Sequence, residues 1–298
     1  MSHWQTTRFA IDLAQPRIMG IVNVTPDSFS DGGQHADTAS ALRHAEQLLK
    51  NGAHILDIGG ESTRPGSPAV PLADELARVL PVVRDAVQLG VPISVDTYKP
   101  EVMAAVLDAG ADIVNDVWAL RQPGAQAVVA AHPACGVCLM HMHRDPQTMQ
   151  AAPMEGDVLP SVLQFLEQSA HALQALGVEK RRIVLDPGIG FGKTVAQNFA
   201  LLARQAELLA AGYPLLVGWS RKSSLGAALL GDAPAPPPPA ERVTASVAAA
   251  LLAAERGAAI VRVHDVRETA QALRVLAHVQ TQVRVAAEKV HAEVSAPG

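Results

Sequence analysis

Eight short runs of apolar residues recur along the chain, and segments with helical periodicity separate one run from the next. Each run is almost continuously apolar, as expected for strands of a parallel sheet that helices cover on both faces. The runs are RIMGIVNV (17–24), HILDIGG (54–60), VPISVDT (91–97), ADIVNDV (111–117), GVCLMHM (136–142), RIVLDPG (182–188), YPLLVGWS (213–220) and AAIVRVHD (258–265). The pattern therefore predicts eight β-then-α units.

The segments between the runs carry their apolar residues on one helical face. Leu42, Ala45 and Leu49 share such a face in the first segment. Gly52 is placed to end that helix, and Pro81 is expected to kink the next helix or to begin a new one. Eight such units favour a single-domain α/β protein, a (β/α)8 TIM barrel over residues 17–285. A doubly wound open sheet is the alternative, because periodicity does not show closure, and both folds bind ligands at the carboxyl ends of their strands.

Composition and charge narrow the class of protein. The chain has 298 residues, 49% of them hydrophobic and 18% charged, which provides a large core and argues against disorder. Length alone suggests roughly two domains of about 150 residues, whereas one α/β barrel needs about 250. The net charge is −5 and the basic residues are not clustered, so no nucleic-acid partner is expected. Because the protein as a whole is negatively charged, an anionic ligand must be bound by donors within its own site.

Neither a membrane nor a disulfide-rich class is expected. No segment has the length and polarity of a transmembrane helix, and residues 1–17 lack the apolar stretch of a signal peptide. We therefore expect a cytoplasmic protein without a membrane partner. The only cysteines are Cys135 and Cys138. Residues three apart in a strand face opposite sides, so we expect two core positions rather than a redox pair or half of a zinc site.

The ends of the chain and one internal segment stand outside the repeat. Residues 1–16 form an N-terminal segment, and residues 286–298 are expected to form a disordered tail. The stretch GDAPAPPPPA (231–240) is rich in proline, and we expect an insert at about 232–240 that is a stiff, exposed connector. Its P-x-x-P pattern leaves a docking motif as the alternative.

Polar residues occupy the carboxyl end of nearly every predicted strand. For any one of them, a helix cap or a loop hydrogen bond is the simpler explanation. The set as a whole favours an enzyme, because the strand ends of a barrel converge on one pocket. Its members are Asn23, Asp57, Asp96, Asn115, Asp116, Met140, His141, Asp186, Ser220, Arg221, Lys222, Arg262 and His264.

The stretch LDPGIGFGKT (185–194) resembles a phosphate-binding loop without matching one. The pattern G-x-x-x-x-G-K-[ST] needs a glycine where this chain has Pro187, which has no N–H to donate. Asp186 is instead placed as an acceptor at the end of a strand. We expect Gly188 and Gly190 to let the backbone lie close under a flat ring.

Two kinds of chemistry share the predicted rim. Asp96, Asn115 and Asp186 provide carboxylate and amide acceptors, which suit a flat heterocycle with several N–H donors, such as a guanine-like or pterin ring. Arg262 and His264 lie two apart on the last strand and point to the same side, where they can bind phosphate or carboxylate groups.

The loop NVTPDSFSDGG (23–33) follows the first strand. Asn23, Asp27, Asp31 and several hydroxyl groups provide oxygen ligands suited to Mg²⁺. The two glycines at its end are typical of a mobile lid. A solvated loop has the same composition and stays the alternative.

Eight motifs, in chain order, resemble those of the dihydropteroate synthases. They are NVTPDSFSDGG (23–33), ESTRPG (61–66), VDTYKP (95–100), NDV (115–117), LMHM (139–142), LDPGIGFGK (185–193), GWSRKS (218–223) and RVHD (262–265). The resemblance extends from Arg17 to Ala277 and includes every predicted strand end. It implies a (β/α)8 barrel that joins 6-hydroxymethyl-7,8-dihydropterin diphosphate to p-aminobenzoate, giving 7,8-dihydropteroate and pyrophosphate. This is a step of folate biosynthesis and a target of sulfonamides.

The resemblance also implies a role for each matching residue. The pterin site comprises Asp96, Asn115, Met140, Asp186, Gly218, Lys222 and Arg262. The p-aminobenzoate site comprises Phe29, Thr63, Arg64, Pro65, Phe191 and Ser223. The diphosphate site comprises Asn23, Arg64, Arg262 and His264. The catalytic residues are Asp31, Lys222, Arg262 and His264. Asn23 is the protein ligand of Mg²⁺, the one cofactor implied, and the partners are the small-molecule substrates and a second copy in a homodimer.

The family mechanism is SN1-like. The bond to the diphosphate breaks early and leaves a pterin methylene cation, which Asp31 stabilises. Two alternatives share the fold. A pterin-dependent methyltransferase would have the pterin acceptors but is not expected to carry ESTRPG and GWSRKS. A catalytically silent pterin-binding barrel would normally lack a key group, and none is missing here.

The chain departs from the family after LMHM. His143 and Arg144 stand where the family often has glutamine and glycine. His141 and His143 share a strand face, which is compatible with zinc, but no third ligand is evident and a zinc site is not expected.

Overall fold

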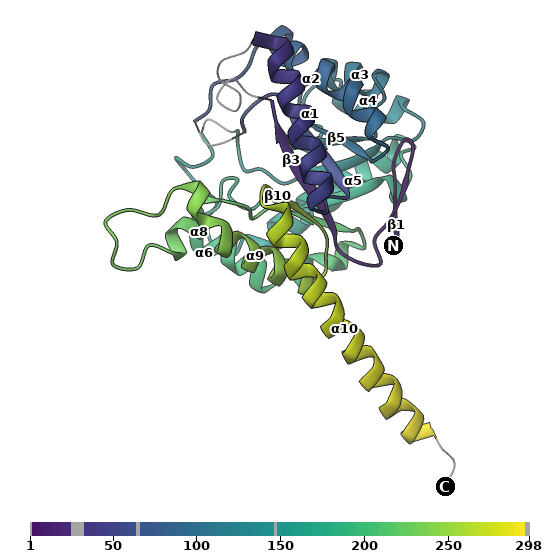
Figure 1. Ribbon diagram of the computed structural model, residues 1–298, viewed down its shortest axis with the longest axis vertical. Coiled ribbons are helices and arrows are strands. Elements are labelled where there is room, and N and C mark those ends of the chain that lie inside the picture. The colour runs from purple at the N-terminus through teal and green to yellow at the C-terminus, as the bar shows by residue number, and fades with distance from the viewer. Residues whose placement is uncertain (1, 25–32, 64–65, 146–147, 296–298) are drawn as a thin grey trace.

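Eight parallel strands form a closed barrel (Figure 1). The computed structural model describes residues 2–24, 33–63, 66–145 and 148–295. The strand order is β10-β3-β4-β5-β6-β7-β8-β9, with the last strand closing on the first. Closure confirms the predicted (β/α)8 barrel and excludes the open sheet. The strands are β3 (Arg17–Asn23), β4 (Ile55–Gly59), β5 (Ile93–Asp96), β6 (Ile113–Asp116), β7 (Gly136–Met140), β8 (Ile183–Asp186), β9 (Leu215–Val217) and β10 (Ala258–Val263).

Helices on the outside of the barrel connect the strands. They are α1 (Gly33–Asn51), α2 (Leu72–Ala86), α3 (Pro100–Asp108), α4 (Ala125–Ala131), α5 (Leu159–Ala175), α6 (Val195–Ala203), α7 (Gln205–Leu208), α8 (Ser223–Ala228), α9 (Val243–Glu255) and α10 (Val266–Ser295). Short 3-10 helices are η2 (Val87–Leu89), η3 (Lys180–Arg182), η4 (Leu209–Ala211) and η5 (Pro239–Arg242). Gly52 follows α1 with φ 108°, as predicted for a helix stop. Pro81 lies inside α2 and does not begin a new helix, because the buried Val79 and Val82 on either side hold the chain helical against the barrel.

Three apolar clusters form the core of the described residues, and the two largest lie one on each face of the barrel wall. The larger cluster fills the space between strands and helices and includes Cys135, and the smaller fills the barrel interior and includes Cys138. Both cysteines are buried and carry free thiols, as predicted. The strand alternation of inward and outward side chains accounts for their separation.

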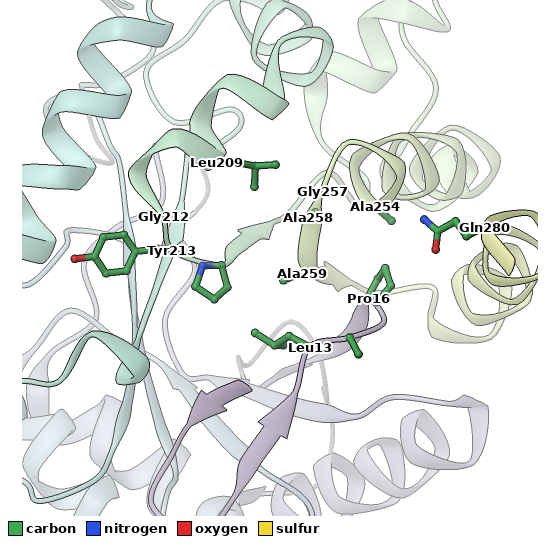
Figure 2. A pocket seen from close by; sticks show the side chains of 12 residues that line it. Leu13, Pro16, Leu209, Gly212, Tyr213, Ala254, Gly257, Ala258, Ala259 and Gln280 are labelled. Carbon is green, nitrogen blue, oxygen red and sulfur yellow. The ribbon is translucent and has the colours of Figure 1, made fainter. Parts of the chain in front are cut away.

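The first residues of the chain close the amino-terminal end of the barrel. β1 (His3–Gln5) and β2 (Ala10–Asp12) pair as an antiparallel hairpin. Trp4 in this hairpin is 0% exposed, and its Nε1 donates to the Arg182 carbonyl at 2.9 Å, just before β8. Trp4 packs with interior residues of the strands, namely Met19, Ile55, Ile113, Cys138, Val184, Leu216 and Ile260. A pocket of about 410 Å³ lies beside the hairpin at this end of the barrel, and Leu13, Pro16, Tyr213 and Gln280 are among the residues that line it (Figure 2).

We expect Trp4→Ala to destabilise the fold by about 3–5 kcal/mol. The substitution removes a fully buried side chain and leaves the Arg182 carbonyl without its donor. Urea unfolding followed by circular dichroism measures the loss. Val275→Ala, at a position that is 64% exposed on α10, is the control and should change stability by less than about 0.5 kcal/mol. A Trp4→Ala loss no larger than that of the control would mean that the hairpin is not part of the core.

Two segments outside the barrel repeat have definite surroundings. The proline-rich segment 232–240 is mostly exposed, and Arg242 ties it to the body by donating to the carbonyls of Pro237 at 2.8 Å and Arg221 at 3.0 Å. Helix α10 projects from the barrel (Figure 1) and continues to Ser295. The backbone is therefore helical through most of 286–298, for which we expected disorder, since this segment is rich in helix-forming alanine and glutamate. In the described parts of the chain, no helix combines the length and apolar character needed to cross a membrane.

Candidate active site

The polar strand ends meet at the carboxyl end of the barrel. Parallel register places them at one level, with Asp96 of β5 beside Asn115 of β6 and Met140 of β7 beside Asp186 of β8. All four of these side chains are buried. The other described residues predicted for this rim are Asn23, Thr63, Phe191, Gly218, Lys222, Ser223, Arg262 and His264. The site is thus built from groups that are far apart in sequence.

Arg262 connects three strands through two buried carboxylates. Its Nε donates to Asp57 Oδ2 at 2.6 Å, and its Nη2 donates to Asp96 Oδ2 at 2.8 Å. Asn115 Nδ2 donates to the same Asp57 oxygen at 3.1 Å. Burial alone would lower the pKa of Arg262, but Asp57 and Asp96 raise it above its ordinary value. The guanidinium therefore stays charged and holds these side chains in one geometry.

Asp96 and Asp57 each keep one acceptor oxygen for a ligand. Within the described residues, Asp96 Oδ1 and Asp57 Oδ1 are buried and accept no hydrogen bond. Burial raises the pKa of Asp96 to about 7; Arg262 opposes this shift and Asp57 adds to it. A buried acceptor without a donor costs about 1–3 kcal/mol. A ligand with N–H donors would offset that cost, which suits a nitrogen heterocycle.

Asp186 and Lys222 form the second charged group of the site. Asp186 Oδ1 accepts the N–H of Gly188 at 2.7 Å, and Lys222 Nζ donates to the carbonyl of Ile189. Burial raises the pKa of Asp186, and the charge of Lys222 opposes that shift. Burial lowers the pKa of Lys222 to about 8; Asp186 opposes the shift and Arg262 adds to it. Each of the two groups thus favours the charged form of the other.

The glycines of LDPGIGFGKT are required by contacts within the protein. Gly188 has φ 66°, and a Cβ there would lie 1.9 Å from the His141 carbonyl oxygen. Gly190 has φ 83°, and a Cβ there would lie 3.3 Å from Lys222 Cδ. Left-handed backbone and close approach to the His141 carbonyl and to Lys222 account for these two glycines within the protein. Clearance for a flat ring stays a prediction.

The Gly-Lys-Thr end of this stretch begins a helix rather than a phosphate cradle. Thr194 Oγ1 accepts the N–H of Gln197 at 3.2 Å, and Gln197 Oε1 accepts the N–H of Thr194 at 2.9 Å. These reciprocal bonds are a capping box at the start of α6.

Part of the predicted p-aminobenzoate site lies in the described residues. The Phe191 ring lies 4.7 Å from Lys222 Nζ and packs against a cluster that contains Met140. Ser223 begins α8, directly after Lys222. Thr63 is half-buried after β4. The predicted residues Phe29, Asp31, Arg64 and Pro65 lie outside the described residues.

The first and last strands provide the anion side of the rim. Asn23 ends β3 and is half-buried. His264 Nδ1 lies 3.0 Å from Ser220 Oγ, which also accepts the His264 N–H at 3.1 Å. Over the described ranges, no group of three or more His, Cys, Asp or Glu side chains could hold a metal ion. A single amide oxygen at Asn23 still fits Mg²⁺, which usually takes one or two protein oxygens and completes its shell with water and substrate phosphates.

Three residues of the polar strand-end set had no individual role predicted, and the structure shows what each of them contacts. Asp57 had no predicted role of its own, because an aspartate at a strand-to-helix junction resembles a cap, and its contacts with Arg262 and Asn115 place it in the site. Asp116 accepts two backbone N–H groups of the turn that follows it and is a cap. Arg221 pairs with Asp265 at 2.5 Å and supports the loop that carries Lys222.

The chain is similar to known proteins over almost its whole length. Residues 19–264 match the family described as pterin binding enzyme. The dihydropteroate synthase of Neisseria meningitidis serogroup B is 52% identical over 91% of this chain and 95% of its own length. The structure of Burkholderia cenocepacia dihydropteroate synthase complexed with 7,8-dihydropteroate is 50% identical, with TM-score 0.85 over 95% of this chain and 98% of that chain. That of the Yersinia pestis dihydropteroate synthase, solved with a sulfonamide drug complex, is 44% identical, with TM-score 0.87 over 94% and 99%.

These matches define the class first: the chain is a pterin-binding enzyme built on a TIM barrel. At this identity and coverage the chain belongs to the dihydropteroate synthases, which are transferases.

Proposed function

We propose that this chain condenses 6-hydroxymethyl-7,8-dihydropterin diphosphate with p-aminobenzoate. The bond between the pterin methylene carbon and the diphosphate oxygen breaks, and the arylamine nitrogen bonds to that carbon and loses a proton. The products are 7,8-dihydropteroate and pyrophosphate. The observation that supports this function best is the set of buried acceptors, Asp96, Asn115 and Asp186, held beside Arg262 and Lys222 at the mouth of the barrel.

The pterin ring fits the acceptor side of the rim. Carboxylates bind adjacent N–H groups two at a time, and Asp96 Oδ1, which has no donor among the described residues, is one such acceptor. Asp186 provides a second carboxylate close to the charge of Lys222. Met140 ends β7 and Gly218 follows β9, so the two residues flank Asp186 at the end of β8 and line the space beside it.

The diphosphate fits the anion side, where Arg262 and His264 would donate to it and Asn23 would hold Mg²⁺. When bound, Mg²⁺ supplies Lewis-acid stabilisation of the departing pyrophosphate. Arg262 and His264 neutralise the negative charge that develops on the same oxygens, and Arg64 joins them. Early departure leaves a pterin methylene cation, next to which we place Asp31. No side-chain nucleophile is needed.

The arylamine fits a subsite formed by Thr63, Phe191 and Ser223 with Phe29, Arg64 and Pro65 from two loops. Sulfonamides carry a similar aromatic amine and compete there. Two further parts of the proposal are that the enzyme acts in the cytoplasm, which rests on the sequence pattern alone, and that it is a homodimer, which rests on family resemblance alone.

An assay with Mg²⁺, the dihydropterin diphosphate and labelled p-aminobenzoate tests the function. We expect labelled dihydropteroate on chromatography, and its loss when a chelator removes the metal, because the diphosphate leaves poorly without a cation to neutralise it. Chelation with magnesium added back in excess is the control. Product formed at an unchanged rate without any divalent metal would contradict the assignment of Mg²⁺.

The same assay separates the alternatives. Pyrophosphate released without coupled product would keep the pterin pocket and contradict the arylamine subsite. If neither product forms, two alternatives remain. A pterin-dependent methyltransferase would be detected by a methyl-transfer assay, and a catalytically silent barrel would still bind pterin. The identity to named synthases favours the first function over both.

A further inference from the structure

A lysine without a predicted role lies buried behind the loop that follows β8. The side chain of Lys193 is only 2% exposed. Its Nζ lies 2.9 Å from His141 Nδ1, 2.9 Å from the Gly188 carbonyl oxygen and 3.2 Å from the Phe191 carbonyl oxygen. The His141 carbonyl oxygen is a fourth neighbour, at 3.5 Å. Three close acceptors match the three N–H donors of an ammonium group, and a neutral amine has only two donors.

The charges around Lys193 Nζ are compatible with an ammonium group at this position. Burial, with the charge of Lys193 adding to it, lowers the pKa of His141 to about 2, so the imidazole is neutral and its Nδ1 accepts. Burial lowers the pKa of Lys193 to about 7, with Asp186 opposing the shift and Lys222 adding to it. A group with this pKa is about half protonated at pH 7, and the three close acceptors around Lys193 Nζ favour the ammonium form.

Two of the three close acceptors of Lys193 belong to a four-residue turn, 188–191, in which every carbonyl is bound. The N–H of the fourth residue donates to the carbonyl of the first at 3.1 Å. Lys193 binds the carbonyls of the first and fourth residues. Lys222 binds the second, and Gln150 Nε2 binds the third at 2.6 Å. Lys193 is the group that holds both ends of the turn.

This turn carries side chains that the reaction uses. Its last residue is Phe191, whose ring lies 4.7 Å from Lys222 Nζ. Its first N–H, that of Gly188, donates to Asp186. A second buried contact fixes its centre, where the Gly190 N–H donates to Asn198 Oδ1 at 2.8 Å. Movement at the fourth residue of the turn would therefore displace the phenyl ring from Lys222 while Gly190 stays anchored.

We propose that Lys193 is a positioning residue for the arylamine step. Its ammonium group holds the 188–191 turn, and through that turn it sets the Phe191 ring against Lys222, where p-aminobenzoate binds. Lys193 itself touches no substrate. The inference rests on the proposed function, because it needs Phe191 in the arylamine subsite.

Lys193→Met tests the inference, since methionine fills the space and removes all three donors. We expect the KM for p-aminobenzoate to rise by about tenfold or more, because misplacement by about 1 Å can cost up to about 100-fold. Affinity for the dihydropterin diphosphate, measured by calorimetry without the arylamine, should stay within about threefold. Amide hydrogen exchange at 188–191 should become faster.

Arg182→Met is the matched control. Arg182 is also a buried cation that donates to backbone carbonyls, those of Cys135 at 2.8 Å and Val129 at 3.0 Å, but it lies at the amino end of β8. The Arg182→Met variant should lower the Tm as Lys193→Met does. It should leave unchanged the KM for p-aminobenzoate, the affinity for the dihydropterin diphosphate and amide hydrogen exchange at 188–191.

Several results would overturn the inference. One is a KM for Lys193→Met within about twofold of wild type, alongside a Tm lowered as in the control, because the ammonium would then stabilise the fold only. Another is an equal loss of pterin affinity, which would mean that Lys193 supports Asp186 instead. If Lys193→Met does not fold, Lys193→Gln replaces it, since glutamine keeps two donors and should raise the KM for p-aminobenzoate by a smaller factor. No rise in that KM would contradict the inference.

Failure of the proposed function is recognised separately. In that case wild-type enzyme forms no dihydropteroate, whereas hydrogen exchange still reports on the turn without any substrate. If amide hydrogen exchange at 188–191 were unchanged in Lys193→Met, the inference that Lys193 holds this turn would be wrong, whatever reaction the enzyme catalyses.

Discussion

Replacing Asp186 with asparagine is expected to weaken binding of the dihydropterin diphosphate by roughly 100-fold, about 3 kcal/mol. The carboxylate offers two acceptors, and asparagine replaces one of them with an NH₂ donor that faces the N–H donors of the ring. Asp186 also raises the pKa of Lys222, which is about 8. Without that charge the pKa falls, so the alkaline decline in pterin affinity should begin at a lower pH. Calorimetric titrations from about pH 6 to about pH 9 measure both effects.

Asp112→Asn provides the matched control for Asp186→Asn. Asp112 is equally buried, but it accepts the N–H of Ile93 at 2.9 Å and pairs with Arg8 at 2.6 Å at the opposite end of the barrel. It should lower stability and leave pterin affinity intact. The assignment of Asp186 fails if its own substitution leaves the affinity unchanged, or if the control loses as much.

The strands of the barrel could be predicted because each is buried on both faces. A run such as RIVLDPG is apolar at nearly every position before its carboxyl end, and that signal survives without any knowledge of tertiary contacts. The N-terminal hairpin could not be predicted in the same way. Its strands are three residues long, and only one residue of each, Trp4 and Ile11, is buried. Over three residues, an alternation of apolar and polar positions does not distinguish a strand from a loop.

The position of the site could be predicted better than its internal connections. Parallel strands bring their carboxyl ends together, so Asp96, Asn115 and Asp186 had to lie near one another once the barrel closed. The partner of Arg262 could not be derived, since Asp57 precedes it by 205 residues. A lysine that follows glycines suggests a phosphate ligand, and only the structure shows Lys193 turned inward. The roles drawn from family resemblance stay predictions for the residues that bind substrate.

Arg262 is the residue whose loss should affect stability and catalysis together. It is the only cation shown bonded to Asp57 and Asp96 among the described residues, and both carboxylates are buried. Removing one partner of a buried ion pair typically costs about 3–5 kcal/mol, because the remaining charge stays buried without compensation. In the proposed reaction the same guanidinium faces the departing pyrophosphate. A single substitution cannot separate the two roles, but a compensating one can.

We expect Arg262→Met to unfold more easily and to lower kcat by roughly 100- to 1,000-fold. The folded-state pKa of Asp96, about 7, lies above its ordinary value of 3.8, and Arg262 holds it down. The folded variant should thus bind a proton that the unfolded chain releases, so its stability should fall as pH rises, through a window that extends above 7. Urea unfolding at about pH 6 and about pH 8 should show the larger deficit at the higher pH. Adding Asp57→Asn removes one buried charge and should restore part of the stability but none of the turnover. Recovered turnover in the double variant would show that Arg262 acts only by holding the carboxylates.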